Sequence, residues 1–141
     1  MATSCPFCSY AEGRFTRELI IYEDEDILVV PCKGQKRSNR GHCLVLTRAH
    51  IPNIYALPHA LSAPILLAVS AAARASKKAF LADGVSLRQN NEPASGQDVF
   101  HLHFHIVPRF LGDDFETSRY ESLDERTRIE QAEALRRAWG L

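Results

Sequence analysis

Histidine and apolar residues alternate strictly from His101 to Ile106, with the period of a β-strand. On an extended chain this pattern places the imidazoles of His101, His103 and His105 on one face. The other face then carries the apolar side chains of Phe100, Leu102, Phe104 and Ile106. The pattern predicts a strand that packs through one face and presents three histidines on the other.

Spacing limits what the three histidines can do together. Alternate side chains on a strand lie about 6.6 Å apart, and those four residues apart lie about 13 Å from each other. Two neighbouring imidazoles can converge on one metal ion, but three on a straight strand can hardly all reach bond lengths of about 2 Å. We therefore expect the three rings to have different roles.

Further apolar runs predict the other strands of a sheet. Residues 18–22 and 27–31 flank an acidic run and predict a hairpin with a charged turn. A polar connection over residues 33–41 carries four basic residues and is either a solvated loop or a segment that steers phosphate: Lys33, Lys36, Arg37 and Arg40. It leads to a short buried strand within residues 41–50. A further strand at residues 85–89 leads through a loop over 90–96 into the strand with the histidines. The Pro and Gly of this loop can turn polar groups toward a ligand beside the histidines.

Two helices follow from apolar residues at helical spacing. The first covers residues 61–82 and begins near Ser62, because Pro64 is tolerated only in a first turn. Its predicted packing stripe is Leu66, Val69, Ala73 and Phe80. The C-terminal helix follows a capping box formed by Ser122 and Glu125. Its predicted stripe is Ile129, Ala132, Leu135 and Trp139.

Together these elements predict an α+β fold in one domain over residues 1–141. We expect an antiparallel sheet of about five strands, with the long helix across one face and the C-terminal helix beside it. A chain of 141 residues is large enough to bury about two-thirds of the surface that its unfolded form exposes.

Charge and composition exclude some partners. The 17 basic and 17 acidic residues balance, so no global field attracts a nucleic acid polymer or an anionic membrane. The N-terminus lacks signal-peptide features, and the longest apolar segment, around residues 63–73, is too short to span a bilayer. We expect a cytoplasmic protein whose four cysteines are thiols or metal ligands.

Cys5 and Cys8 form a C-x-x-C motif with two possible chemistries. A redox pair normally opens a helix after a strand, and no strand is predicted before this motif. A structural zinc ion fits better, because two thiolates supply half of a tetrahedral site. The alternative is an unmetallated pair of buried thiols. The candidates for the two remaining zinc ligands are His42, His50, His59 and His101.

The stretch from Gly96 to Arg109 closely resembles the signature of the histidine triad family, in which a Gly-Gln pair precedes histidines that alternate with apolar residues. The resemblance extends over residues 5–110 and points to the zinc-carrying, bacterial-type branch. It implies a zinc site formed by Cys5, Cys8, His50 and His101. It also implies a homodimer, often joined around the long helix, and no organic cofactor is expected.

The middle histidine, His103, is the predicted nucleophile. A neutral imidazole keeps a lone pair on one nitrogen near pH 7, and His103 has a ring on either side to contact the phosphoryl group. The resemblance implies the same position, with His105 and His42 stabilising charge on the phosphate or helping to protonate the leaving group. The residues expected to contact substrate are Asn90, Gln97, Asp98 through its backbone amide, and His101.

The predicted reaction is nucleotidyl transfer to water. A nucleoside phosphoramidate or dinucleoside polyphosphate would be cleaved at the α-phosphorus through a covalent intermediate on His103. The chain departs from the family at Gly34, eight positions before His42, where most members carry an acidic residue that binds ribose hydroxyls. It also has Asp98 where many have Ser or Thr. The sequence does not choose the leaving group or the base.

Two other functions remain open from the sequence. In one, His101 and His103 hold a catalytic zinc-bound hydroxide, which requires a third ligand from another strand. In the other, the chain is a non-catalytic, zinc-stabilised nucleotide-binding or scaffold protein of the same fold.

Overall fold

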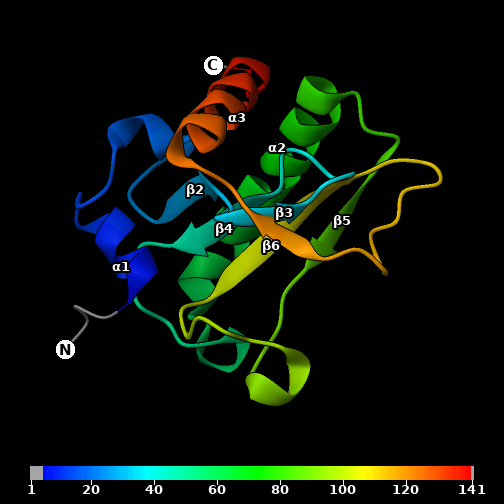
Figure 1. The fold of residues 1–141 in the computed structure, drawn as a ribbon. Coiled ribbons are helices and arrows are strands. Elements are labelled where there is room, and N and C mark those ends of the chain that lie inside the picture. The colour runs from blue at the N-terminus through cyan, green and yellow to red at the C-terminus, as the bar shows by residue number, and fades with distance from the viewer. Residues whose placement is uncertain (1–4, 141) are drawn as a thin grey trace.

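The computed structural model describes residues 5–140 as an α+β fold built on a five-stranded antiparallel sheet (Figure 1). The strand order is β1-β2-β4-β6-β5, so the strand with the histidines, β6, has a neighbour on each side. The bounds are β1 (Tyr22–Glu23), β2 (Ile27–Pro31), β4 (Cys43–Thr47), β6 (His103–Arg109) and β5 (Gly84–Arg88). The predicted sheet is confirmed.

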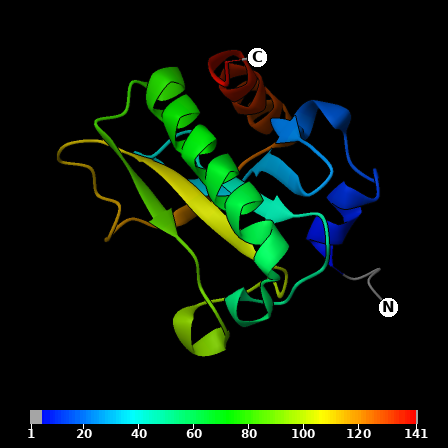
Figure 2. The ribbon, with the colours of Figure 1, turned by 180° about the vertical axis from the view of Figure 1, so that it is seen from behind.

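The long helix α2 (Ser62–Phe80) crosses one face of this sheet, as predicted (Figure 2). Its buried side consists mainly of small residues, which allow a close approach to the sheet: Ile65, Ala68, Val69, Ala72 and Ala75. The prediction that Leu66 packs in this stripe is wrong, since Leu66 is 59% exposed. A helix turns by about 100° per residue, so Ile65 and Leu66 cannot both face the sheet.

The opposite face of the sheet packs against a different part of the chain. Leu28 and Val30 of β2 and Leu44 and Leu46 of β4 form a second core cluster on this face. The cluster includes Phe7 and Tyr10 of α1 (Pro6–Ala11), a short N-terminal helix that had not been predicted. The C-terminal helix α3 (Glu125–Ala138) lies beside α2, as expected (Figure 2).

A second, two-stranded sheet pairs β3 (Gly34–Lys36) with β7 (Tyr120–Ser122) (Figure 1). The sequence had predicted only a polar connection at residues 33–41. Because Ser122 belongs to β7 and pairs with Gly34, the predicted capping box is wrong. The side chain of Asp124 caps α3 instead, accepting a hydrogen bond from the backbone N–H of Thr127 at 2.8 Å.

The first predicted strand is also corrected. Residues 17–19 form a 3-10 turn, and β1 spans only two residues. Leu19, Ile20 and Ile21 are all buried, with Leu19 and Ile20 in one core cluster and Ile21 in the other. The charged turn after β1 is confirmed: the Asp24 carboxylate accepts the backbone N–H groups of Asp26 and Ile27, both at 2.8 Å.

Candidate functional site

β6 brings two of the three histidines together on the sheet face opposite α2. His103 pairs with Leu46 and His105 with Leu44 across the β4–β6 ladder, and their ring centroids lie 5.0 Å apart. His101 precedes the strand, and its ring lies 5.1 Å from the ring of His50 instead. The three histidines therefore occupy two different environments.

The ring of His103 is oriented by a backbone carbonyl. Its Nδ1 lies 2.7 Å from the carbonyl oxygen of His101, which can only accept, so the proton is on Nδ1 and Nε2 keeps its lone pair. The Phe7 ring packs against it in a T-shaped arrangement, with ring centroids 4.8 Å apart. Burial lowers the pKa of His103 below 6.5, although the hydrogen bond and Asp98 act in the opposite direction. His103 is therefore neutral at pH 7.

His42 lies directly before β4, the strand next to β6, and its ring pairs with that of His105. The backbone at Gly41 has a φ of +92°, and a Cβ there would lie 2.3 Å from the Phe80 ring, so only glycine fits before His42. His42 Nε2 and His105 Nδ1 are 2.9 Å apart, a hydrogen bond in which one nitrogen donates. Gly41 thus fixes the backbone from which His42 reaches His105.

The direction of this hydrogen bond follows from burial. His42 Nδ1 is buried and has no hydrogen-bond partner within residues 5–140. Buried unpaired N–H donors are rarer than unpaired acceptors, so we place the His42 proton on Nε2, donating to His105 Nδ1. The His105 proton then lies on Nε2. Burial is the main factor that lowers the pKa of His42 to about 3 and that of His105 to about 4, so both rings are neutral at pH 7.

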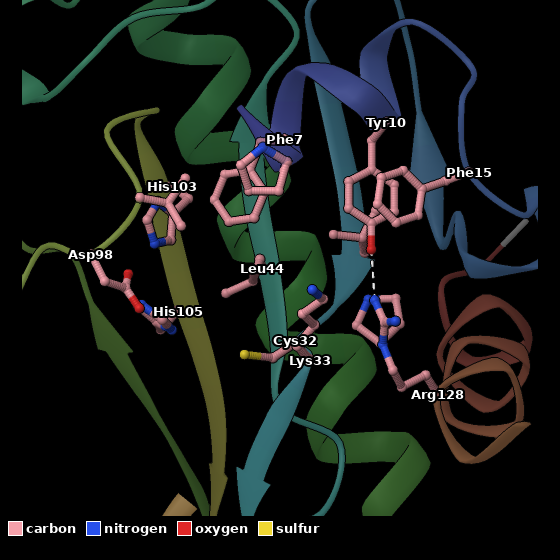
Figure 3. Close-up of a pocket in the computed structure, with 14 residues that line it drawn as sticks. Phe7, Tyr10, Phe15, Cys32, Lys33, Leu44, Asp98, His103, His105 and Arg128 are labelled. Atoms are coloured by element: carbon pink, nitrogen blue, oxygen red, sulfur yellow. Dashed lines mark hydrogen bonds between the residues drawn. The ribbon is translucent and has the colours of Figure 1, made fainter. Parts of the chain in front are cut away.

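A cavity lies beside His103 and His105 on the same face (Figure 3). Its aromatic side is formed by the N-terminal segment, which contributes Phe7, Tyr10 and Phe15. Val30 and Leu44 of the sheet also line it. The cavity is largely apolar, with polar side chains at opposite ends. This composition suits a flat organic group whose charged end reaches the histidines.

Four potential metal ligands gather where α1 meets the start of β6. Their ligand atoms all lie within 4.8 Å of one another, and the residues are Cys5, Cys8, His50 and His101. Sulfur-to-Nδ1 distances are 3.5 Å for Cys5–His101, 3.2 Å for Cys8–His50 and 3.6 Å for Cys8–His101. Ligand atoms around a tetrahedral zinc ion, with bonds of about 2.0 to 2.3 Å, lie at comparable separations.

The protonation of His101 suits a metal ligand. Its Nε2 lies 2.6 Å from the Thr47 carbonyl oxygen, so Nε2 carries the proton and the Nδ1 lone pair points toward the two thiols. Burial, with a smaller effect from Cys5, raises the pKa of the Cys8 thiol to about 11. A bound cation would offset this cost of ionising the thiol. The four residues therefore fit a zinc ion.

The other residues predicted to contact substrate do not all line the cavity. Asp98 lines the cavity beside His103 and His105. The Gln97 amide is engaged by backbone: it accepts from Glu92 N–H at 2.6 Å and donates to the Pro52 carbonyl at 2.6 Å, so it holds the loop before β6. His101 has neither ring nitrogen free for substrate, because Nδ1 faces the metal cluster and Nε2 bonds the Thr47 carbonyl. Asn90 lies in the same loop, with its side-chain nitrogen beside Gly96.

Several cavity residues were not among the predicted site residues. Cys32 and Lys33 line the cavity, whereas Gly34, the position singled out by counting back from His42, belongs to β3. Arg128 of α3 also lines it, although it lies well beyond β6 in the sequence. Only the folded chain brings such distant residues together. Cys32 also joins His42 and His105 in a second group of ligand atoms within 4.8 Å of one another.

Neither group of potential ligands found within residues 5–140 contains both His101 and His103. The alternative function in which these two histidines hold a catalytic metal ion therefore lacks its third ligand in this part of the chain.

Comparison with known proteins identifies the family. The family model described as HIT domain matches residues 16–112, well over half of the chain. The chain belongs to the HIT family. Among curated relatives of this HIT protein, Protein hit of Bacillus subtilis is 36% identical over 115 residues, covering 81% of this chain and 77% of the relative.

The name of a second relative states an activity. The protein named Adenylylsulfatase HINT3 of Arabidopsis thaliana is 31% identical over 109 residues, covering 77% of this HIT protein but 54% of the plant protein. This chain therefore corresponds to about half of that relative.

Solved structures agree with the fold. A Hit-like protein of Bartonella henselae, described as involved in cell-cycle regulation, has a TM-score of 0.85 and 31% identity, covering 96% of this HIT protein and 97% of that chain. A Zn-bound histidine triad family protein of Mycobacterium smegmatis has a TM-score of 0.82 and 32% identity, covering 99% and 95%. No helix within residues 5–140 has both the length and the apolar character needed to cross a bilayer.

Proposed function

We propose that this HIT protein is a nucleotide hydrolase and nucleotidyl transferase that cleaves nucleoside phosphoramidates or dinucleoside polyphosphates at the α-phosphorus. The observation that carries the proposal is the hydrogen bond from His103 Nδ1 to the His101 carbonyl, because it leaves the Nε2 lone pair free on a neutral ring. His103 also lines a cavity that suits a nucleoside.

In the first step, His103 Nε2 attacks the α-phosphorus. A nitrogen–phosphorus bond forms, and the bond from phosphorus to the leaving group breaks, with the bonding electrons going to the leaving group, which takes a proton from solvent. The His103 ring becomes a cationic phosphoramidate, and its Nδ1–H remains bonded to the His101 carbonyl. One displacement is thereby divided into two easier ones.

In the second step, water attacks the same phosphorus. The new oxygen–phosphorus bond forms as the nitrogen–phosphorus bond breaks, and its electrons return to His103 Nε2. The water gives up one proton to solvent, and the product is a nucleoside monophosphate. The two steps together add one water molecule across the original bond to phosphorus.

Neighbouring groups stabilise the charge on the phosphoryl oxygens. His105 donates from Nε2, because its Nδ1 already accepts from His42. The backbone amide of Asp98, with Asn90, completes the set of proposed donors, while Gln97 holds their loop. Donors that are already in place typically contribute about 3 to 4 kcal/mol each to transition-state stabilisation.

The proposed zinc ion is structural. Cys5, Cys8, His50 and His101 would supply all four ligands, which leaves no open position for substrate or water. When bound, the ion supplies a cross-link between α1 and the start of β6. The Zn-bound relative from Mycobacterium smegmatis supports this proposal. The four free cysteines are in keeping with the cytoplasmic location that we also propose.

Several leaving groups are compatible with the proposed reaction. The name of the Arabidopsis relative indicates cleavage of an adenylyl group from sulfate, which is the same bond class with a different leaving group. We expect the natural substrate to share the nucleoside 5′-phosphoryl part.

The test is direct detection of the covalent intermediate. The protein is mixed with adenosine 5′-phosphoramidate or diadenosine tetraphosphate, quenched within one turnover and measured by intact mass spectrometry. We expect an added nucleotidyl mass that is lost on acid treatment, and no adduct with His103→Asn. Nucleotide binding without adduct or turnover would instead support a non-catalytic binding protein.

A further inference from the structure

One cavity residue, Arg128, has no role in the proposed chemistry. It lies in the first turn of α3, outside the residues that match the HIT domain. Its side chain is buried, with 6% of the residue exposed, yet it lines the same cavity as His103. Figure 3 shows it beside Tyr10, across the cavity from His103.

The guanidinium of Arg128 is incompletely satisfied. Nη2 donates to the Tyr10 hydroxyl at 2.6 Å, but Nε is buried and has no hydrogen-bond partner within residues 5–140. None of the ion pairs found in that part of the chain includes Arg128. A buried cation without a counter-ion destabilises a fold, so its presence in a ligand cavity indicates that a ligand supplies acceptors.

The surroundings of Arg128 select the kind of acceptor. Tyr10 and Phe15 stack with ring centroids 3.9 Å apart and line the cavity near it, which favours a flat aromatic group. A phosphate dianion would require several donors, and the other cation in the lining, Lys33, is exposed. A nucleotide with its phosphate at His103 therefore places its base, not another phosphate, at Arg128.

We propose that Arg128 reads the base of the nucleotide and favours 6-oxopurines, so that guanosine nucleotides bind more tightly than adenosine nucleotides. Guanine presents two adjacent acceptors, O6 and N7, to an arginine fork, whereas adenine presents N7 beside an amino donor that repels it. This inference rests on the proposed function for the orientation of the nucleotide. It adds to that function the class of base that the substrate carries.

The first test measures equilibrium binding of GMP and AMP by calorimetry, since these monophosphates are products and are not turned over. We expect the wild-type chain to bind GMP about tenfold more tightly than AMP. Arg128→Met should reduce the ratio to less than about twofold. The matched control is Arg126→Met on the same helix, an exposed position with the same charge change, which should retain the wild-type ratio.

A second test changes the base instead of the protein, so it holds even if Arg128→Met fails to fold. IMP keeps O6 and N7 but lacks the amino group of guanine, and 7-deaza-GMP lacks N7. We expect IMP to bind like GMP, and 7-deaza-GMP to lose most of the preference. Equal affinity for GMP and AMP, or a preference that survives in folded Arg128→Met, overturns the inference.

Turnover separates this inference from the proposed function. A GMP preference that depends on Arg128, without any His103 adduct, would support base reading and reject the hydrolase. An adduct that forms equally with guanosine and adenosine phosphoramidates, without a binding preference, would support the hydrolase and reject base reading. If neither monophosphate binds, the base-reading inference is overturned, and the His103 adduct alone decides the proposed function.

Discussion

At the scale of single residues, the proton on each imidazole decides its proposed role. The His101 carbonyl leaves His103 with a free Nε2 lone pair, and His42 leaves His105 with an Nε2–H donor. Two chemically identical side chains, two residues apart, thus become a nucleophile and a donor. The sequence predicted which ring would be the nucleophile, but the partners that set each proton appear only in the structure.

Substitutions at these two rings should therefore differ in effect. His103→Asn removes the nucleophile but keeps an N–H donor for the His101 carbonyl, and we expect kcat to fall by at least about a thousandfold. His105→Ala removes one donor to the phosphoryl group, and we expect a fall of about a hundredfold. Steady-state kinetics with a nucleoside phosphoramidate measures both losses. Thermal unfolding within a few degrees of wild type is the control, and equal losses would contradict the assigned roles.

The low pKa of His42 has a consequence for stability. Between about pH 3 and pH 6.5 the unfolded chain protonates this residue while the folded chain keeps it neutral, so the unfolded state binds more protons. The free energy of unfolding must then fall as the pH is lowered below about 6.5. The contribution of His42 to this slope approaches about 1.4 kcal/mol per pH unit.

Urea unfolding of wild type and His42→Asn at pH 7, 6 and 5 measures this effect. We expect the wild type to lose more stability than the variant over this range, since an asparagine side chain does not bind a proton in either state. Parallel profiles for the two proteins would show that His42 does not titrate as described.

At the scale of elements, the sequence predicted what local periodicity determines. Strand β6, helix α2 and the turn at Asp24 follow from patterns of a few neighbouring residues. The failures involve distant partners: β3 and β7 lie far apart in the sequence, and Ser122 could be recognised as a strand residue only through their pairing. The wrong prediction for Leu66 also involves a distant partner, because the packing of α2 on the sheet determines which of its faces is buried.

Helix α1 depends most on a distant partner. It has only six residues, too few for a helix that is stable by itself, yet its Phe7 and Tyr10 line the cavity. The proposed zinc ion would join it to β6 through Cys8. We expect Cys8→Ser, or removal of metal with a chelator, to lower Tm by more than about 5 °C and to raise KM more than it lowers kcat.

The matched control is Ser9→Ala in the same helix. Ser9 lies outside the metal cluster, so its substitution should leave Tm and KM close to wild type and keep the response to chelator. Complete loss of kcat on metal removal, with the fold intact, would instead favour a catalytic metal. A metal analysis of the purified protein accompanies each measurement.

At the scale of the whole molecule, the sheet divides the chain into two sides. The side opposite α2 carries the histidines and the cavity, with walls added by α1 and α3 from outside the HIT match. The family signature therefore contains the histidines proposed to react, whereas the residues that would select the base lie in regions that the signature does not include. The other side ends in the outer surface of α2, where Leu66 and Leu67 are 59% and 69% exposed.

These two leucines lead to a prediction about assembly. Burying an exposed leucine contributes about 1.5 to 3 kcal/mol, and a two-fold contact around α2 would bury four of them. We expect the protein to be a homodimer in analytical ultracentrifugation, and Leu66→Glu with Leu67→Glu to produce a monomer with unchanged circular dichroism. Arg126→Glu, at an exposed position on α3, is a control for added acidity away from this contact and should remain dimeric. A wild-type protein that stays monomeric at about 100 µM, or a double variant that remains dimeric, would exclude α2 as the interface.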